Sequence, residues 1–189
     1  MVDKSAAVGG PSSAVEVFAI GHSTRPLDKF IELLQAHHIK TLADIRTIPR
    51  SGTNPQFNRE NLERELPSVA IRYLQLKELG GLRRPLPDSH NLGWENASFR
   101  GYADYMQKPE FAAALEELVG IATEARTAIM CAEGNPFRCH RHLVADALTV
   151  RGVSVFHISS RKTARPHELT RFARVEGTRV SYPARLEVA

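Results

Sequence analysis

Residues 127–152 read TAIMCAEGNPFRCHRHLVADALTVRG, and this stretch decides the predicted fold. Its first five residues, Thr127 to Cys131, form an apolar run typical of a buried strand. After it, apolar residues recur at the spacing of an amphipathic helix: Leu143, Val144, Ala147 and Leu148. Ligands usually bind beyond the carboxyl ends of strands in an open parallel sheet, so we expect a site in the polar loop between strand and helix.

The composition is that of an ordinary globular protein. Of the 189 residues, 42% are hydrophobic and 24% are charged, which predicts one packed core. Residues 1–13 are small and polar, without the order of a signal peptide, and are expected to form a flexible tail. We expect residues 14–189 to form a single α/β domain. No apolar run approaches the ~20 residues that a membrane-spanning helix needs, so no membrane partner is expected.

The cysteine count indicates the cellular compartment, and the net charge indicates the kind of partner. Two cysteines are too few for a disulfide framework, so we expect reduced thiols in a cytoplasmic protein. The formal net charge of +4 is a mild basic bias. It favours an anionic partner, either a small molecule or a nucleic acid, and establishes neither. The sequence indicates no particular cofactor or oligomeric state.

Strands and helices alternate along the rest of the chain. Strand patterns cover residues 15–20, 41–45, 69–76 and 153–158, with a small edge strand at 179–183. Helix patterns cover residues 26–37, 58–66 (ending before Pro67), 99–107 and 109–122. This alternation predicts a three-layer α/β domain, Rossmann-like, with a mainly parallel central sheet flanked by helices.

A parallel sheet would bring distant polar residues together. The carboxyl ends of the first four strands carry His22-Ser23, Asp44 to Arg46, Gly80-Gly81 and Cys131 to Glu133. Since the carboxyl ends of parallel strands share one edge of the sheet, we expect these side chains to meet there.

Several motifs in the same order resemble one known family. They are GHST at 21–24, DIRTIPRS at 44–51, NPQFNRENL at 54–62, LGG at 79–81, ASFRGYADYMQ at 97–107 and CAEGNPFRCHRHLVADAL at 131–148. Together they resemble the family called domain of unknown function 488 over about residues 15–182. The resemblance implies a cytosolic α/β domain and supplies no substrate. It marks as motif positions His22, Asp44, Arg46, Cys131, Glu133, Cys139, His140 and Arg141.

Cys139 is the candidate nucleophile. It precedes the last long helix and is followed by His140 and Arg141, and both the positive helix end and the basic neighbours stabilise a thiolate. His22 or His140 could serve as its base. The alternative is a small buried residue with a packing role, because cysteine is often buried.

Cys131 is expected to pack rather than react, because it ends a central strand. Cys131 and Arg138 also frame a loop that is similar to a phosphate cradle, although its spacing is one residue too long and Glu133 would repel phosphate. A zinc site is a further alternative, with ligands drawn from Cys131, Cys139, His140, His142 and either His22 or Asp44. The usual close ligand pairs are missing, and His140 and His142, two apart on a helix, should point in different directions.

Asp44 and Arg46 lie two residues apart and should face the same side of an extended strand end. Asp44 could act as a general base or orient His22, and Arg46 could hold a carboxylate or phosphate. A salt-bridge network that ties the loops to the sheet is an equally good interpretation. Glu133 could pair with Arg46 or Arg141.

The loop over residues 82–100 mixes arginines with aromatic residues, which suggests a nucleic-acid surface. Its candidates are Arg83, Arg84, Trp94 and Arg100, with Phe57 and Tyr102 nearby. An ordinary surface loop is the simpler interpretation, because no dense basic stripe is present.

The leading hypothesis is an enzyme that acts on an anionic substrate, including nucleotide-like molecules or nucleic acid. Its catalytic residues are Cys139, His22, Asp44 and Glu133, and its substrate-binding residues are Arg46, Cys131, His140, Arg141 and Ser23. This hypothesis assigns no metal to the site. The alternatives are a non-catalytic nucleic-acid or nucleotide binding module and a metal-binding protein that uses Cys and His ligands.

Overall fold

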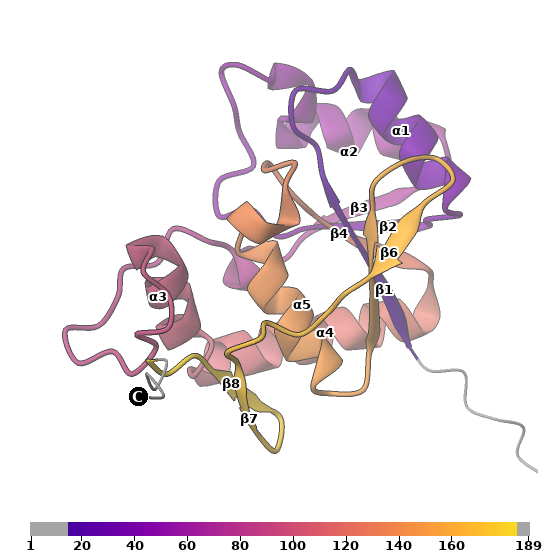
Figure 1. Cartoon of the computed structure of the whole chain (residues 1–189). Coiled ribbons are helices and arrows are strands. Elements are labelled where there is room, and N and C mark those ends of the chain that lie inside the picture. The colour runs from indigo at the N-terminus through magenta and orange to yellow at the C-terminus, as the bar shows by residue number, and fades with distance from the viewer. Residues whose placement is uncertain (1–14, 185–189) are drawn as a thin grey trace, which may run out of the picture.

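A central six-stranded sheet organises the computed structural model, which describes residues 15–184; the tail predicted over residues 1–13 lies outside them (Figure 1). The strand order is β3-β2-β4-β1-β5-β6. The first five strands in this order are parallel, and β6 runs antiparallel to β5. The strands are β1 Glu16–Gly21, β2 Thr41–Asp44, β3 Arg72–Gln75, β4 Thr127–Cys131, β5 Ser154–Ile158 and β6 Ala164–Pro166.

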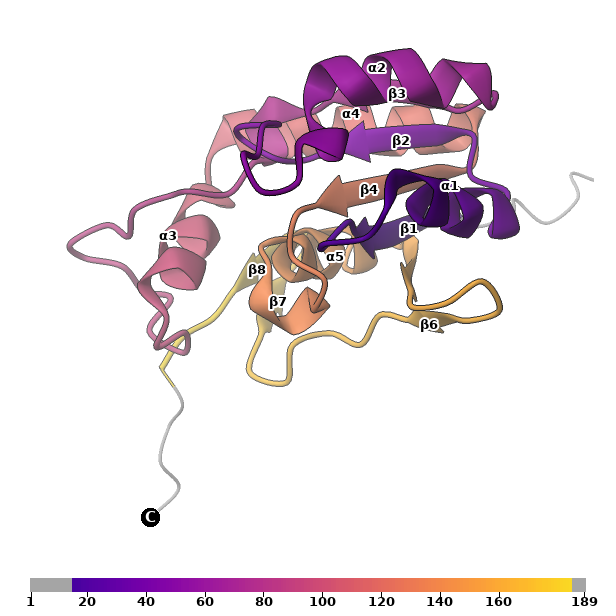
Figure 2. The ribbon, with the colours of Figure 1, turned by 90° about the horizontal axis from the view of Figure 1, so that it is seen from above.

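Among the described residues the chain forms five α-helices, and four of them cover the two faces of this sheet, while α3 lies beyond the carboxyl ends of the strands (Figure 2). They are α1 Leu27–Ala36, α2 Arg59–Ser68, α3 Ala97–Tyr105, α4 Pro109–Glu124 and α5 Arg141–Thr149. Short 3-10 helices are η1 Pro55–Phe57, η2 Lys77–Leu79 and η3 Pro136–Arg138. The helices α1 and α2 lie on one face, and α4 and α5 lie on the other (Figure 1). The predicted three-layer α/β fold is therefore confirmed.

Strand β4 shows why the chain forms two cores. All five of its residues are buried, and successive side chains of a strand point to opposite faces. Ala128 and Met130 pack with α1 and α2, whereas Ile129 and Cys131 pack with α4 and α5. A strand buried on both faces has to be apolar throughout, which is why the run is not alternating.

The register of the strands brings their carboxyl ends together. Gly21 pairs with Cys131, and Asp44 pairs with Met130. The arrows of β1, β2 and β4 point the same way in Figure 2. The segments that follow these strands, which carry His22, Arg46 and Glu133, therefore leave the sheet at the same edge.

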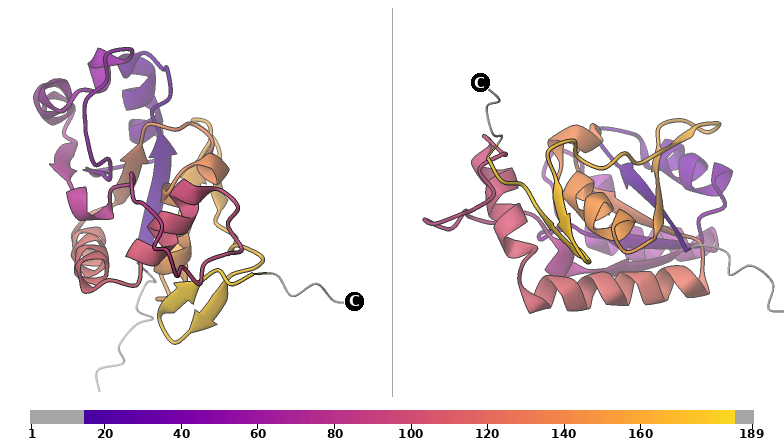
Figure 3. Two further views of the ribbon diagram at one scale, coloured as in Figure 1. Left: turned by 90° about the vertical axis from the view of Figure 1, so that its left-hand side faces the viewer. Right: turned by 60° about the horizontal axis from the view of Figure 1, so that its bottom comes forward.

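The structure corrects three of the predicted boundaries. Helix α2 continues through Pro67 to Ser68, because the carbonyl of Leu66 accepts the amides of Val69 and Ile71 and closes the last turn. This turn delays β3, which begins at Arg72 rather than at residue 69. The strand expected at 179–183 is β8 Arg179–Ser181, which pairs with β7 Arg174–Glu176 in a separate hairpin (Figure 3). Among residues 15–184, no helix combines the length and apolar content needed to cross a membrane.

Candidate functional site

A cavity of about 320 Å³ opens at the carboxyl ends of β2 and β4, and we call it the thiol pocket. Its lining includes Cys131, Cys139, His140, Arg46, Glu133 and Arg138. Ligand pockets in proteins range from about 300 to 1,000 Å³, so this one suits a small molecule. Both cysteines of the chain face it as free thiols.

Cys139 lies at the turn between η3 and α5, one residue before the helix N-cap. Its sulfur accepts a hydrogen bond from the backbone N–H of Arg141 at 3.4 Å. It also lies 3.6 Å from Nδ1 of His140. Helix N-termini favour negative charge, so this position stabilises a thiolate.

The ring of His140 is oriented by two neighbours. Its Nε2 lies 2.9 Å from the carbonyl oxygen of Ile45. A carbonyl only accepts hydrogen bonds, so Nε2 carries the proton and the Nδ1 lone pair faces Cys139. A Cβ at position 81 would come within 3.0 Å of Nδ1, so Gly81 leaves the room that this ring needs. His140 is thus placed to take the proton of the Cys139 thiol.

The two thiols differ strongly in acidity. A hydrogen bond from the Cys131 thiol, together with the contact with His140, outweighs burial and lowers the pKa of the Cys139 thiol to about 4. Burial raises the pKa of the Cys131 thiol well above its usual range. Cys131 therefore stays protonated, with its sulfur 3.6 Å from the carbonyl oxygen of Glu133, while Cys139 carries the charge.

Arg141 contacts the end of β4 and the loop that follows it, and its side chain is buried. Its NH1 lies 3.1 Å from the sulfur of Cys131 and donates to the carbonyl of Glu133 at 3.2 Å. A Cβ at position 21 would lie 1.9 Å from that carbonyl and 2.8 Å from NH1, so only glycine fits beside them. Arg141 therefore holds the loop and does not reach into the thiol pocket.

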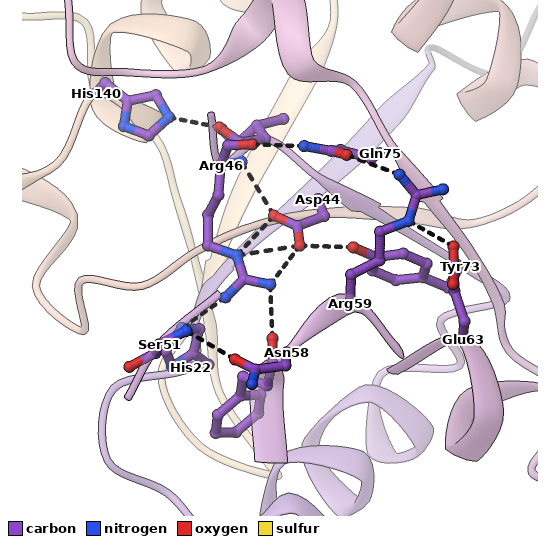
Figure 4. A network of polar contacts seen from close by, with 12 residues as sticks. His22, Asp44, Arg46, Ser51, Asn58, Arg59, Glu63, Tyr73, Gln75 and His140 are labelled. Carbon is purple, nitrogen blue, oxygen red and sulfur yellow. Dashed lines mark hydrogen bonds and ion pairs between the residues drawn. The ribbon is translucent and has the colours of Figure 1, made fainter. Parts of the chain in front are cut away.

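Asp44 and Arg46 form a second group, buried beside the thiol pocket (Figure 4). The carboxylate of Asp44 accepts from the guanidinium and backbone N–H of Arg46 and from the hydroxyl of Tyr73 at 2.8 Å. Arg46 also donates to the carbonyl of Phe57 at 2.8 Å, and its NH1 lies 3.3 Å from Nε2 of His22. Each of the three guanidinium nitrogens has a partner within the protein.

His22 belongs to this group rather than to the thiol pair. Its ring stacks on Phe57 with centroids 4.2 Å apart, and its Nδ1 donates to the carbonyl of Ser23 at 2.7 Å. Burial, opposed by the bond to Ser23, and the nearby charge of Arg46 lower the pKa of His22. Its Nε2 accepts from Arg46, so the ring is neutral and has no free nitrogen for Cys139.

Two further predicted site residues, Glu133 and Ser23, contact neighbouring residues through their backbone, and Glu133 also does so through its side chain. The carboxylate of Glu133 accepts from the backbone N–H of Asn135 at 3.2 Å, and the contact of Glu133 with Arg141 is made by its backbone carbonyl. Ser23 contributes the backbone carbonyl that His22 contacts, with φ of 52°. Within residues 15–184 the carboxylate of Glu133 forms no ion pair, and the substrate-binding role of Ser23 stays a prediction.

The aromatic residues proposed to stack on bases are used inside the protein. Phe57 and Tyr102 are fully buried. Trp94 packs against Phe99 with ring centroids 4.7 Å apart. The guanidinium of Arg83 lies over the ring of Tyr105, 3.6 Å from its centroid. The loop over residues 82–100 therefore presents few free aromatic faces.

The zinc ligand set expected from the sequence is divided between two places. His140 faces Cys139 and Ile45, whereas His142 points to the opposite side of the α5 N-terminus, where its Nε2 lies 3.0 Å from Oγ1 of Thr170. There it meets His157 on β5 and His167 in the segment after β6. We call His142, His157 and His167 the histidine cluster. No close pair of ligand residues in the sequence includes His157 or His167, so neither was predicted to bind a metal.

A family model described as "Domain of unknown function DUF488" matches residues 26–148. No curated protein and no solved structure matches the chain.

Proposed function

The chain belongs to the DUF488 family of domains of unknown function, and from the chemistry of the thiol pocket we propose that it is a thiol-dependent enzyme acting on a small anionic substrate. One observation carries the proposal. The sulfur of Cys139 lies between Nδ1 of His140 and the backbone N–H of Arg141, at the wall of a cavity. A nucleophile, its base and a group that orients the base are the parts that covalent catalysis needs.

The proposed reaction is a hydrolysis through a covalent intermediate. Before the reaction the proton of Cys139 already lies on Nδ1 of His140, so the sulfur is a thiolate, and this thiolate forms a bond with an electrophilic atom of the substrate. The leaving group departs with its electron pair and takes the proton from Nδ1. Water then attacks the intermediate, the bond to sulfur breaks, and the proton from water returns to the Cys139–His140 pair.

In this proposal His140 is the base, and His22, Asp44 and Arg46 hold the edge of the pocket in place. Ile45 joins the two groups, because its carbonyl orients His140 and it lies between Asp44 and Arg46 in sequence. Asp44 and His22 thus act through position, and the catalytic roles predicted for them pass to His140.

The preference for an anion rests on Arg138 and on the helix end. Arg138 is the exposed arginine of the pocket lining, and the N-terminus of α5 adds positive potential beside Cys139. Glu133 at the rim opposes a highly charged substrate. A small substrate with one or two negative charges fits this balance and the volume of about 320 Å³.

Alkylation with a neutral and an anionic reagent tests both parts of the proposal. Iodoacetamide and iodoacetate form the same bond, sulfur to carbon, with loss of iodide. Because the pKa of Cys139 is lowered to about 4, its rate with iodoacetamide should stay nearly constant from pH 5.5 to pH 8. The rate of glutathione should fall about tenfold per pH unit below its pKa of roughly 8.5. Mass spectrometry of the tryptic peptides locates the label.

Single variants separate the contributions of Cys139, His140 and Arg138 to the labelling rate. His140→Phe should restore a rate that rises with pH, and Cys139→Ser should abolish labelling. Arg138→Gln should lower the ratio of the iodoacetate rate to the iodoacetamide rate several-fold, whereas Arg64→Gln, at an exposed arginine of α2, should leave it unchanged. A Cys139 whose rate follows pH as glutathione does would refute the nucleophile.

A further inference from the structure

The histidine cluster lines a second cavity, of about 560 Å³, on the other side of Arg141 from the thiol pocket. Its three residues come from α5, from β5 and from the segment after β6. One ring nitrogen from each lies within 4.8 Å of the other two. Such convergence from three separate segments is the arrangement that a three-coordinate protein site for a metal requires.

The protonation of His167 is fixed by Asp146. This carboxylate is fully buried and accepts from Nε2 of His167 at 2.8 Å, from the backbone N–H of Thr170 at 3.0 Å and from the hydroxyl of Tyr182 at 2.7 Å. Nε2 therefore carries the proton, and Nδ1 of His167 is left with a lone pair. That Nδ1 faces Nε2 of His157 at 2.9 Å.

The protonation of His142 is fixed by Thr170. The hydroxyl of Thr170 donates to Asp146 at 2.7 Å, so its oxygen accepts from Nε2 of His142 at 3.0 Å. Nδ1 of His142 is then also a lone pair. It is buried and has no hydrogen-bond partner among the described residues, and the same is true of Nδ1 of His157. Buried nitrogen atoms without a partner are uncommon and need an explanation.

We propose that His142, His157 and His167 bind one divalent transition-metal ion of the zinc class and leave a coordination position open toward the cavity. Two nitrogens bound to one zinc at about 2.0–2.1 Å lie roughly 3.3 Å apart in tetrahedral geometry. The 2.9 Å between Nε2 of His157 and Nδ1 of His167 is close to that separation, so these two atoms and Nδ1 of His142 are the proposed ligands. The ring proton of His157 then lies on its Nδ1. Imidazole ligands suit zinc, copper, nickel and cobalt, and exclude the oxygen-seeking ions magnesium and calcium.

The surroundings of the cluster match those of known metal-binding histidines. Such histidines usually donate their second ring N–H to a carboxylate or another acceptor, as His167 does to Asp146 and His142 to Thr170.

The open position would take water or an anion. Arg25, Arg141 and Arg165 line the same cavity, with Glu168 as the acidic residue among them. This inference does not rest on the thiol chemistry proposed above, because neither cysteine lines this cavity.

Titration of the metal-stripped, tag-free protein with Zn²⁺ by calorimetry tests the proposal. We expect one zinc per chain, and at least about a 100-fold loss of affinity in His157→Gln and in His142→Gln. His90→Gln, at an exposed histidine, and the double variant Cys131→Ser/Cys139→Ser should bind as the wild type does. Circular dichroism checks that each variant is folded.

X-ray absorption on the cobalt-loaded wild type gives a readout that needs no variant. It should count three imidazoles and no sulfur around the ion. Sulfur in the coordination shell, zinc binding lost in the cysteine variant, or zinc binding unchanged in both histidine variants would overturn the proposal.

Discussion

Two buried aspartates, Asp44 and Asp146, each hold a cluster of polar side chains, and the two clusters differ in whether every nitrogen has a partner. Around Asp44, Arg46 has a partner for each guanidinium nitrogen, and both ring nitrogens of His22 have contacts. Around Asp146 the carboxylate itself is satisfied, but ring nitrogens of His142 and His157 are not. We call a network closed when each of its polar atoms has a partner, and such a network stabilises the fold. We call a network open when some of its nitrogen atoms have no partner, and these atoms can still bind a ligand.

The two clusters also differ in the charge of the groups that contact each aspartate. Asp44 is paired with a permanent cation, Arg46. The hydrogen bonds to Asp146 come from Thr170, Tyr182 and His167, and none of these is a permanent cation. A metal beyond His167 would face a carboxylate through the imidazole, which is the arrangement that raises the basicity of a ligating histidine.

The largest effect is expected from breaking the closed network. Asp44→Asn leaves the guanidinium of Arg46 buried without its counter-charge, and removing one partner of a buried ion pair costs about 3–5 kcal/mol. We expect the free energy of unfolding, measured by urea denaturation, to fall by that amount. Zinc affinity should not change.

Asp88→Asn, at an exposed aspartate, is the matched control and should change stability by less than about 0.5 kcal/mol. The double variant Asp44→Asn/Arg46→Met should recover part of the loss, because the uncompensated charge is gone. An Asp44→Asn protein as stable as the wild type would mean that the network is not closed in the way described.

A smaller effect is expected from loosening the open network. Thr170→Val keeps the shape of the side chain but removes the oxygen that accepts from Nε2 of His142. The ring then loses the contact that fixes its protonation, and zinc affinity should fall roughly tenfold or more. Calorimetry measures this loss, and Thr178→Val, at an exposed turn, should show none. An unchanged zinc affinity in Thr170→Val would show that Thr170 does not contribute to metal binding.

The sequence predicted the convergence of the strand ends well, for a physical reason. Apolar runs such as Thr127 to Cys131 identify parallel strands, and parallel strands place their carboxyl ends at one edge. The position of Cys139 just before a helix followed from the same pattern. What the sequence did not give is the choice between His22 and His140 as its neighbour, because that depends on which acceptor each ring meets.

The histidine cluster was out of reach for a different reason. His157 could have been noticed, since it lies near the carboxyl end of β5 and pairs in register with Ala19 of β1. His167 has no such signal. It reaches the cluster only because β6 folds back antiparallel on β5, and the basic segment after Ile158 shows no periodic pattern that predicts this return.

The smallest effect concerns His22, and it tests whether the Asp44 cluster stays closed as the pH changes. Burial, opposed by the bond to Ser23, and the charge of Arg46 lower the pKa of His22 in the folded protein, with Asp44 and Arg25 also facing it. The unfolded chain therefore binds a proton below about pH 6.5 that the folded chain does not, so stability falls as the pH falls. Between pH 7.5 and 5.5 this group accounts for at most about 1.4 kcal/mol. In urea denaturation, the stability lost between pH 7.5 and pH 5.5 should be smaller in His22→Gln than in the wild type, by up to that amount. The difference should be the same with or without zinc, because both nitrogens of His22 already have partners. An equal loss in both proteins would show that the fold does not lower the pKa of His22.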